Sequence, residues 1–362
     1  PRSSSAASDV YKRQVKDNAT NNLNTSLVTL ADGVTVDNTS PTATLGYNPT
    51  GPYKQGDTVT ITATFNEDMA DSPLPKIAIA GSGFANTSAT DMTRNPSGSS
   101  NKKIYTYSYT VPSGNGTGTI TLSNGTDVAG NTLTTPTSNN TFTVDNTKPT
   151  GDLTFGSDGP YKQGDTVNIF VTFSEDMADT TDPQITITGS GITTTTITMS
   201  KIGSSAQNYS AAYTVPSGNA TCTMEFTAGT DLAGNTITPT PQQNSTFTID
   251  NTPPTMTIGA KGGTSNNTVS SGDTTADTTL SLTFTSSETT SNFSSGDITV
   301  TNGAISNFGG SGTTYTATFT PTSPGNCTIN VSTGKYTDTA GNNNNAVSFA
   351  WTFVEAPFMT IT

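Results

Sequence analysis

The fold is decided by the stretch GPYKQGDTVTITATF, residues 51–65. Its second half alternates apolar residues with threonines, so that Val59, Ile61, Ala63 and Phe65 fall on one face, as in a half-buried β-strand. Its first half combines Gly, Pro and Asp, which mark a turn before the strand. The block GPYKQGDTV returns at residues 159–167, a shift of 108 positions (159 − 51). Because a fixed period is the signature of a repeat architecture, we expect an array of similar units.

Three further motifs repeat with this block. NEDMAD from Asn66 returns as SEDMAD from Ser174. The block D-x-A-G-N begins at three positions, Asp127, Asp231 and Asp338. A joint of the form VDNT or IDNT, followed closely by Pro, contains Asp37, Asp145 and Asp250. These joints divide the chain into predicted domains at 41–148, 149–253 and 254–356. The third is divergent, because it lacks GPYKQGD and carries Glu288 in place of the EDM block.

The two ends of the sequence are interpreted as parts of other segments. Residues 15–40 contain apolar alternation and a VDNT joint, which predicts the closing part of a preceding domain. Residues 357–362 echo the first strand of a unit and are expected to begin a further repeat. Residues 1–14, PRSSSAASDVYKRQ, share neither composition nor period with the rest, so they are set aside as a non-native leader.

Each unit is predicted to be an all-β sandwich. In the first unit, alternation bounded by Gly, Pro, Asn and Asp predicts strands at 42–47, 57–65, 76–81, 87–93, 103–111, 117–123 and 139–145. About seven short strands in roughly 105 residues is the pattern of an immunoglobulin-like sandwich. No stretch shows the apolar spacing and caps of a helix. The fold class is therefore tandem immunoglobulin-like β-sandwiches in an elongated array.

The composition excludes several classes of function. His is absent, which excludes imidazole catalysis and His-ligated zinc, and two Cys cannot build a zinc cluster. The formal net charge of −13 repels phosphate backbones and anionic lipid, so neither nucleic acid nor a membrane surface is expected as a partner. No apolar run reaches the 18 or so residues of a membrane span. Hydrophobic residues make up only 30% of the chain and charged residues 11%, which suits strands buried on one face.

The repeated blocks carry a resemblance to a known family. The D-x-A-G-N blocks, the V-D-N-T joints and GDITVTNGAISNFGGSGTTYTATFTP at residues 296–321 resemble bacterial Ig-like domains from the tandem repeats of large surface adhesins and biofilm-associated proteins. The resemblance covers about residues 15–362. It implies a location at the bacterial cell surface and a structural role as a stalk or spacer, without enzymatic activity. Its implied partners are the neighbouring repeats of the same chain, while a glycan or protein ligand stays open.

Acidic residues are expected to meet at the joint before each sandwich. In a seven-strand sandwich of this type, the loop with EDM and the loop with D-x-A-G-N lie at the end where the chain arrives from the preceding joint. Carboxylate and amide oxygens are the ligands that Ca²⁺ prefers, so we expect calcium at these joints. The alternative is that the same Asp and Asn residues only form turns. The candidate metal ligands are Asp37, Asn38, Glu67, Asp68, Asp127, Asn131, Asp145, Asn146, Glu175, Asp176, Asp231, Asn235, Asp250, Asn251, Glu288, Asp338 and Asn342.

Other readings compete with these predictions. A glycosidase needs two carboxyl groups that face each other across the substrate. Glu67 and Asp68 are adjacent on one loop and are copied in other units, so this pair fits a glycosidase poorly. Cys222 and Cys327 alternate in step with the apolar residues of their predicted strands and so fall on the core face. This favours buried free thiols over a disulfide between them. The tyrosines of the fifth predicted strand are expected in the core.

A carbohydrate-binding or fibre-forming role is the alternative function, and a repeat appended to a secreted hydrolase is a third. The surface candidates for sugar stacking are Tyr53 and Tyr161, in the turn before the second strand.

Overall fold

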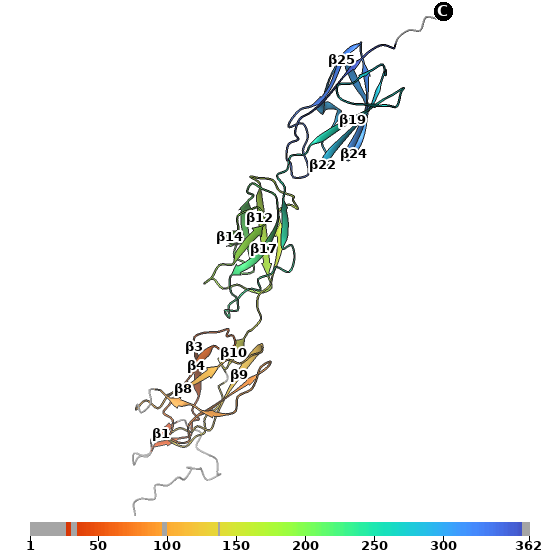
Figure 1. The fold of residues 1–362 in the computed structure, drawn as a ribbon. Helices are drawn as coiled ribbons and strands as arrows, with labels where there is room; N and C mark the ends of the chain where they lie inside the picture. The colour runs from red at the N-terminus through yellow and green to blue at the C-terminus, as the bar shows by residue number, and fades with distance from the viewer. Residues whose placement is uncertain (1–26, 30–34, 96–99, 137, 357–362) are drawn as a thin grey trace, which may run out of the picture. The chain divides into compact units, whose positions relative to one another are not determined.

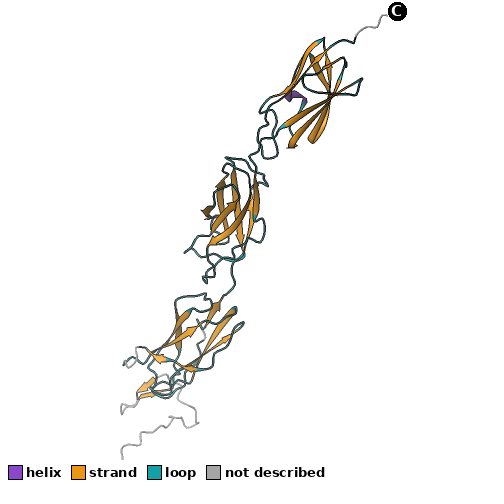
Figure 2. Ribbon diagram, viewed as in Figure 1, coloured by secondary structure: helices purple, strands orange, loops and turns teal. Residues whose placement is uncertain are grey.

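The computed structural model describes residues 27–29, 35–95, 100–136 and 138–356 (Figure 1). The chain divides into two compact units, one of residues 1–148 with 230–236 and one of residues 149–229 with 237–362, and each is described by itself. Strands dominate the described residues, as Figure 2 shows. The predictions for residues 1–14 and 357–362 lie outside the described residues, as does most of 15–40.

The first sandwich consists of two four-stranded antiparallel sheets. One has the order β3-β4-β8-β7 and the other the order β10-β9-β5-β6. The strand bounds are β3 Ala43–Asn48, β4 Thr58–Phe65, β5 Lys76–Gly81, β6 Thr90–Asp91, β7 Thr93–Arg94, β8 Ile104–Thr110, β9 Gly116–Ser123 and β10 Thr141–Val144. Before it, β1 Leu27–Thr29 pairs with β2 Thr35–Asp37.

Alternation along β4 builds the core as predicted. Val59, Ile61, Ala63 and Phe65 are all buried, while the threonines between them face outward or lie half-buried. The predicted strand at 87–93 differs from the structure, because it divides into β6 and β7, which belong to different sheets. Buried Met92 lies between the two, so the chain crosses from one sheet to the other while its side chain closes the core.

The second sandwich repeats the arrangement of the first. Its sheets have the orders β11-β12-β16-β15 and β14-β13-β17-β18. The bounds are β11 Gly151–Phe155, β12 Thr166–Phe173, β13 Gln184–Gly189, β14 Thr195–Thr198, β15 Ser200–Lys201, β16 Asn208–Thr214, β17 Ala220–Ala228 and β18 Thr246–Ile249. Its core runs from Leu153 to Ile249 and so is complete within the predicted domain at 149–253.

The third sandwich has the same two-sheet plan with longer strands. Its sheets have the orders β20-β19-β22-β24 and β21-β26-β25-β23, and β21 runs parallel to β26. The bounds are β19 Met256–Gly262, β20 Thr268–Val269, β21 Thr274–Thr275, β22 Leu280–Thr290, β23 Ile298–Thr301, β24 Gly303–Pro321, β25 Gly325–Val331 and β26 Val347–Phe353, with a short 3-10 helix at Ser295–Asp297.

A buried carboxylate organises the divergent start of this sandwich. Asp277 accepts hydrogen bonds from the Thr275 hydroxyl at 2.7 Å and from the backbone and hydroxyl of Ser265 at 2.9 and 2.8 Å. These hydrogen bonds lower the pKa of Asp277 to about 2, and the bond from Thr275 has the largest effect. The carboxylate therefore stays ionised and supports a loop that the other two sandwiches lack.

The structure decides between the readings of the aromatic and cysteine residues. The fifth-strand tyrosines Tyr105, Tyr109, Tyr209 and Tyr213 are buried, as predicted, whereas Tyr107 is half-buried against the edge of the core. Cys222 and Cys327 are buried free thiols, also as predicted.

The prediction that Tyr53 and Tyr161 lie on the surface is wrong. They are 2% and 4% exposed. The reason is that each ring turns inward and packs edge-on against a core phenylalanine, Phe142 or Phe247, at 5.9 Å between ring centroids.

Candidate metal centre

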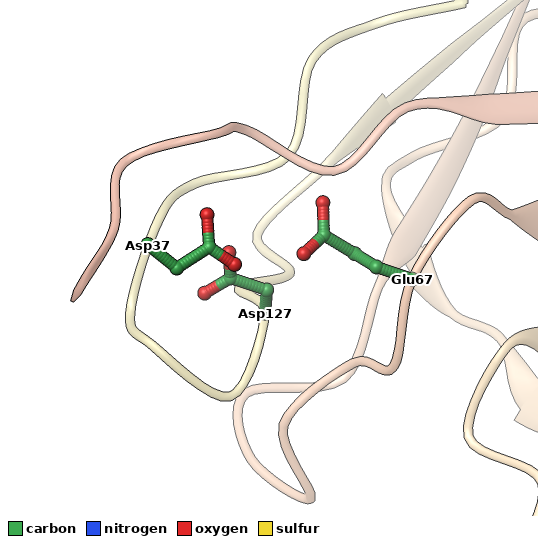
Figure 3. Close-up of side chains that lie close together, drawn as sticks. All are labelled: Asp37, Glu67 and Asp127. Carbon is green, nitrogen blue, oxygen red and sulfur yellow. The ribbon is translucent and has the colours of Figure 1, made fainter. Parts of the chain in front are cut away.

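Three elements that are distant in sequence bring carboxylates together at the start of the first sandwich. Asp37 ends β2, Glu67 follows β4, and Asp127 lies in the loop between β9 and β10. One carboxylate oxygen from each lies within 4.8 Å of the others. Figure 3 shows the three side chains pointing toward a common point. This is the convergence of joint, EDM loop and D-x-A-G-N loop that the sequence predicted.

Backbone contacts between the two loops place Glu67 beside Asp127. Met69 is fully buried and forms a β-bridge with Asp127, and the amide of Ala70 donates to the carbonyl of Thr126 at 2.8 Å. The apolar methionine anchors the EDM segment in the core, because its burial is favourable only on that side of the loop. The preceding glutamate is therefore held at the surface of the joint.

Asn131 ties the two aspartates together. Its backbone amide donates to Oδ1 of Asp127 at 2.8 Å, and its Nδ2 donates to Oδ2 of Asp127 at 2.8 Å and to the backbone carbonyl of Asp37 at 3.0 Å. Asp37 in turn accepts from the amide of Thr39 through Oδ1 at 2.9 Å. Asn131 is thus a donor that positions two acids.

The electrostatics of the group favour a bound cation or proton. Burial, and then the charges of Asp37 and Asp127, raise the pKa of Glu67. Burial is the larger cause, and the two aspartates add to it because three carboxylates at this separation repel one another when all are ionised. A divalent cation would remove that repulsion, as would a proton on Glu67.

The third sandwich repeats the group within the second compact unit. Asp250, Glu288 and Asp338 again place one oxygen each within 4.8 Å of the others. Asn342 repeats the role of Asn131, since its Nδ2 donates at 2.9 Å to Asp338 and at 2.9 Å to the backbone carbonyl of Asp250. Burial, and then the charges of Asp250 and Asp338, raise the pKa of Glu288.

The candidates of the middle joint are divided between the two compact units. In the first unit, Nδ2 of Asn235 donates to Asp231 at 2.8 Å and to the backbone carbonyl of Asp145 at 2.9 Å, as at the other joints. In the second unit, Glu175 follows β12 and is half-buried, while Asp176 is exposed and accepts from Gln207 at 2.9 Å.

Several predicted residues lie outside the three-carboxylate groups. Asp68 is exposed and is not among the clustered acids of the described residues. Oδ1 of Asn146 accepts from the backbone of Gln55, and Oδ1 of Asn251 accepts from that of Gln163. Asn38 is exposed and follows Asp37 in the joint. The geometry therefore brings together the Asp of the joint, the first acid of the EDM block and the Asp of D-x-A-G-N.

The comparisons with known proteins identify the class of these sandwiches. Residues 250–353 match the family described as a bacterial Ig-like domain, and residues 100–236 match the bacterial Ig-like domain of group 3. The chain belongs to the bacterial Ig-like domains and is a tandem array of them. Such domains are typical of surface or extracellular proteins and are generally non-catalytic modules. No curated protein matches the chain.

The solved structures that the chain matches share little sequence with it. A marsupial T cell receptor is 11% identical, with a TM-score of 0.34, over 88% of this chain and 100% of its own. Domains 1–6 of the surface layer protein SbsC are 14% identical, with a TM-score of 0.21, over 88% of this chain and 55% of theirs. Salmonella alpha-2-macroglobulin reacted with methylamine is 10% identical, with a TM-score of 0.22, over 86% of this chain and 23% of its own. These similarities carry no functional argument.

Within the ranges that the structure describes, no helix has the length and apolar character needed to cross a bilayer.

Proposed function

We propose that this chain is a structural spacer segment of an extracellular bacterial surface protein, and that Ca²⁺ bound at its joints makes the spacer rigid. The observation that carries the proposal is the repeated group of three carboxylates at the start of the first and third sandwiches. Each group takes its members from the joint and from two loops of the following sandwich. A cation there would bind the linker to the domain that follows it.

The geometry of the group suits calcium. Ca²⁺ binds oxygen at 2.3–2.6 Å, so two ligands on opposite sides of one ion lie about 4.6–5.2 Å apart. Oxygens that are within 4.8 Å of one another can therefore share one calcium ion. Mg²⁺ demands shorter bonds in a near-ideal octahedron and retains its water, which fits three carboxylates from separate loops less well. Carbonyl and amide oxygens of the joint, with water, would supply the remaining ligands.

The repeated core supports the spacer role. Each sandwich has its own hydrophobic cluster, so no sandwich depends on another for a buried face. Short polar joints between such domains bend unless something fixes them. A cation held by the linker and both loops would restrict this bending.

Calorimetry and scattering of the full chain test the proposal. We expect calcium to bind with measurable heat, and the maximum dimension in small-angle X-ray scattering to be larger with calcium than with a chelator. The double variant Asp250→Asn with Asp338→Asn should lose binding at the third sandwich only. The exposed pair Asp158→Asn with Asp182→Asn serves as the matched control. Absence of calcium heat together with unchanged dimensions would leave these residues as turn formers.

The carbohydrate-binding alternative depended on Tyr53 and Tyr161 as exposed rings, and neither ring is exposed. The Tyr53 hydroxyl donates to the carbonyl of Pro49 and the Tyr161 hydroxyl to that of Ser157, and both rings lie in the core. Neither ring is therefore offered to a sugar. A glycan array remains the direct experiment, and binding by the folded chain would favour this alternative over a spacer.

A further inference from the structure

The lysine of the repeated block is held in a fixed direction. The backbone amides of Lys54 and Lys162 donate to Oδ2 of Asp57 and Asp165, each at 3.0 Å. Their ammonium groups lie 3.6 and 3.2 Å from Oδ1 of the same aspartates. One carboxylate therefore closes the turn and directs the side chain. The repetition of these lysines inside GPYKQGD is the signal in the sequence for such a role.

Each lysine lies against the D-x-A-G-N loop of the following sandwich, beside its glycine. Within the first compact unit, Nζ of Lys54 donates to the carbonyl of Ala233 at 3.4 Å. A Cβ added to Gly234 would lie 2.9 Å from the same Nζ. Within the second unit, a Cβ added to Gly341 would lie 3.4 Å from Nζ of Lys162 and 3.9 Å from its Cδ. The lysine stem thus runs across the loop and covers it.

The alanine is buried in the two loops that a lysine approaches and exposed in the first sandwich, where no lysine of the described residues approaches the glycine. Ala233 and Ala340 are each only 7% exposed. In the first sandwich the equivalent Ala129 is exposed, and a Cβ added to Gly130 would have nothing within 4 Å. The turn itself is the same in all three loops, with φ of 94°, 86° and 86° at the glycine. A lysine of the preceding sandwich therefore accompanies the burial of the alanine in the second and third sandwiches.

The residue before the alanine stays exposed in the loop of the second sandwich, where Leu232 is 59% exposed. Lysine stems cover small apolar groups while the ammonium reaches a carbonyl, and a carboxylate-bearing loop favours the positive charge. A tip of small residues is what allows this close approach.

We propose that the lysine of the K-x-G-D turn is a latch that recognises the Ala-Gly tip of the next bacterial Ig-like repeat, and that it acts without a metal ion. The partner surface is thus a second repeat of the same family, and repeats with a different tip fit the lysine less well. The third sandwich lacks the latch residue. Ser270 occupies the lysine position, where its amide donates to Asp273 at 2.7 Å in the same turn.

Distance measurements between spin labels in the second and third sandwiches test the latch in the full chain. Labels at Thr223→Cys and Thr299→Cys lie on exposed strand positions, and the native Cys222 and Cys327 are buried. In chelator, Lys162→Ala should broaden the distance distribution and raise the open population about two- to fivefold. Lys162→Arg should restore a narrow distribution, and Ala340→Lys should broaden it by repulsion. The exposed Lys261→Ala is the matched control.

The outcomes separate the latch from the calcium sites. A Lys162→Ala distribution identical to that of the unsubstituted chain in chelator would overturn the latch, whether or not calcium binds. Broadening by Lys162→Ala, with calcium affinity changed less than about twofold, would support a metal-independent contact. Failure of calcium to bind would refute the proposed metal sites and leave this result unaffected. Unchanged circular dichroism of each variant verifies folding.

Discussion

Glu67 lies between two aspartates, and its ionisation acts against the folded state when no cation is present. Its pKa is raised above the ordinary value of 4.5 by burial and by Asp37 and Asp127. The folded protein therefore binds the proton more tightly than the unfolded chain. The resulting destabilisation is absent below the unfolded pKa and complete above the folded pKa, so it grows as pH rises through that window.

Because ionised Glu67 destabilises the folded state, removing its charge should stabilise the metal-free first sandwich at neutral pH. In chelator, Glu67→Gln should raise its melting temperature at pH 7 and remove the part of the pH dependence that comes from this group. In calcium, the same variant should bind the ion more weakly at the first joint. Thermal unfolding followed by circular dichroism, with exposed Glu225→Gln as the control, measures both effects. A lower melting temperature for Glu67→Gln in chelator would contradict the repulsion argument.

At the scale of elements, the loop between β25 and β26 differs from the equivalent loops of the first two sandwiches at one position, where an amide replaces an apolar side chain. Six residues after the Asp of D-x-A-G-N, the first two sandwiches place Leu133 and Ile237 (127 + 6 and 231 + 6), and the third places Asn344 (338 + 6). Asn344 is fully buried. Its Oδ1 accepts from the amides of Lys335 and Tyr336, and its Nδ2 donates to the carbonyls of Ser332 and Asn345.

Replacing Asn344 should destabilise the third sandwich even when the new residue is apolar. Asn344→Leu matches the other sandwiches in residue type but leaves the amides of Lys335 and Tyr336 without a partner, at about 1–3 kcal/mol for each unsatisfied group. Urea unfolding should show a loss of at least about 2 kcal/mol, whereas exposed Asn345→Ala should change stability little. Equal stability of Asn344→Leu and the unsubstituted chain would show that this loop rearranges freely.

At the scale of the whole molecule, the second sandwich should be an independent folding unit. Every member of its buried cluster lies between Leu153 and Ile249. Residues 149–253 expressed alone are therefore expected to be a monomer with a strand-rich circular dichroism spectrum and a single cooperative transition, with a free energy of unfolding of about 5–15 kcal/mol. A helical or unfolded spectrum in the presence of calcium would contradict this expectation.

The sequence by itself determined the repeat, the all-β class and the positions of the long core strands. These are readable because alternation with period two is a local property, and a strand such as Thr58–Phe65 needs only its own residues to show it. The meeting of joint, EDM loop and D-x-A-G-N loop was also predictable, because sandwich topology brings those segments to one end.

The tertiary structure alone decided where individual loop side chains point. Tyr53 turned inward onto Phe142, and Lys54 reached the tip of a loop 179 residues away. Asn131 donates to the carboxylate of Asp127 and to the backbone carbonyl of Asp37. A loop has no period that fixes a face, so each direction depends on partners supplied by strands and loops remote in sequence. For the same reason, the core strands were predictable from the sequence, whereas the contacts at the joints required the folded structure.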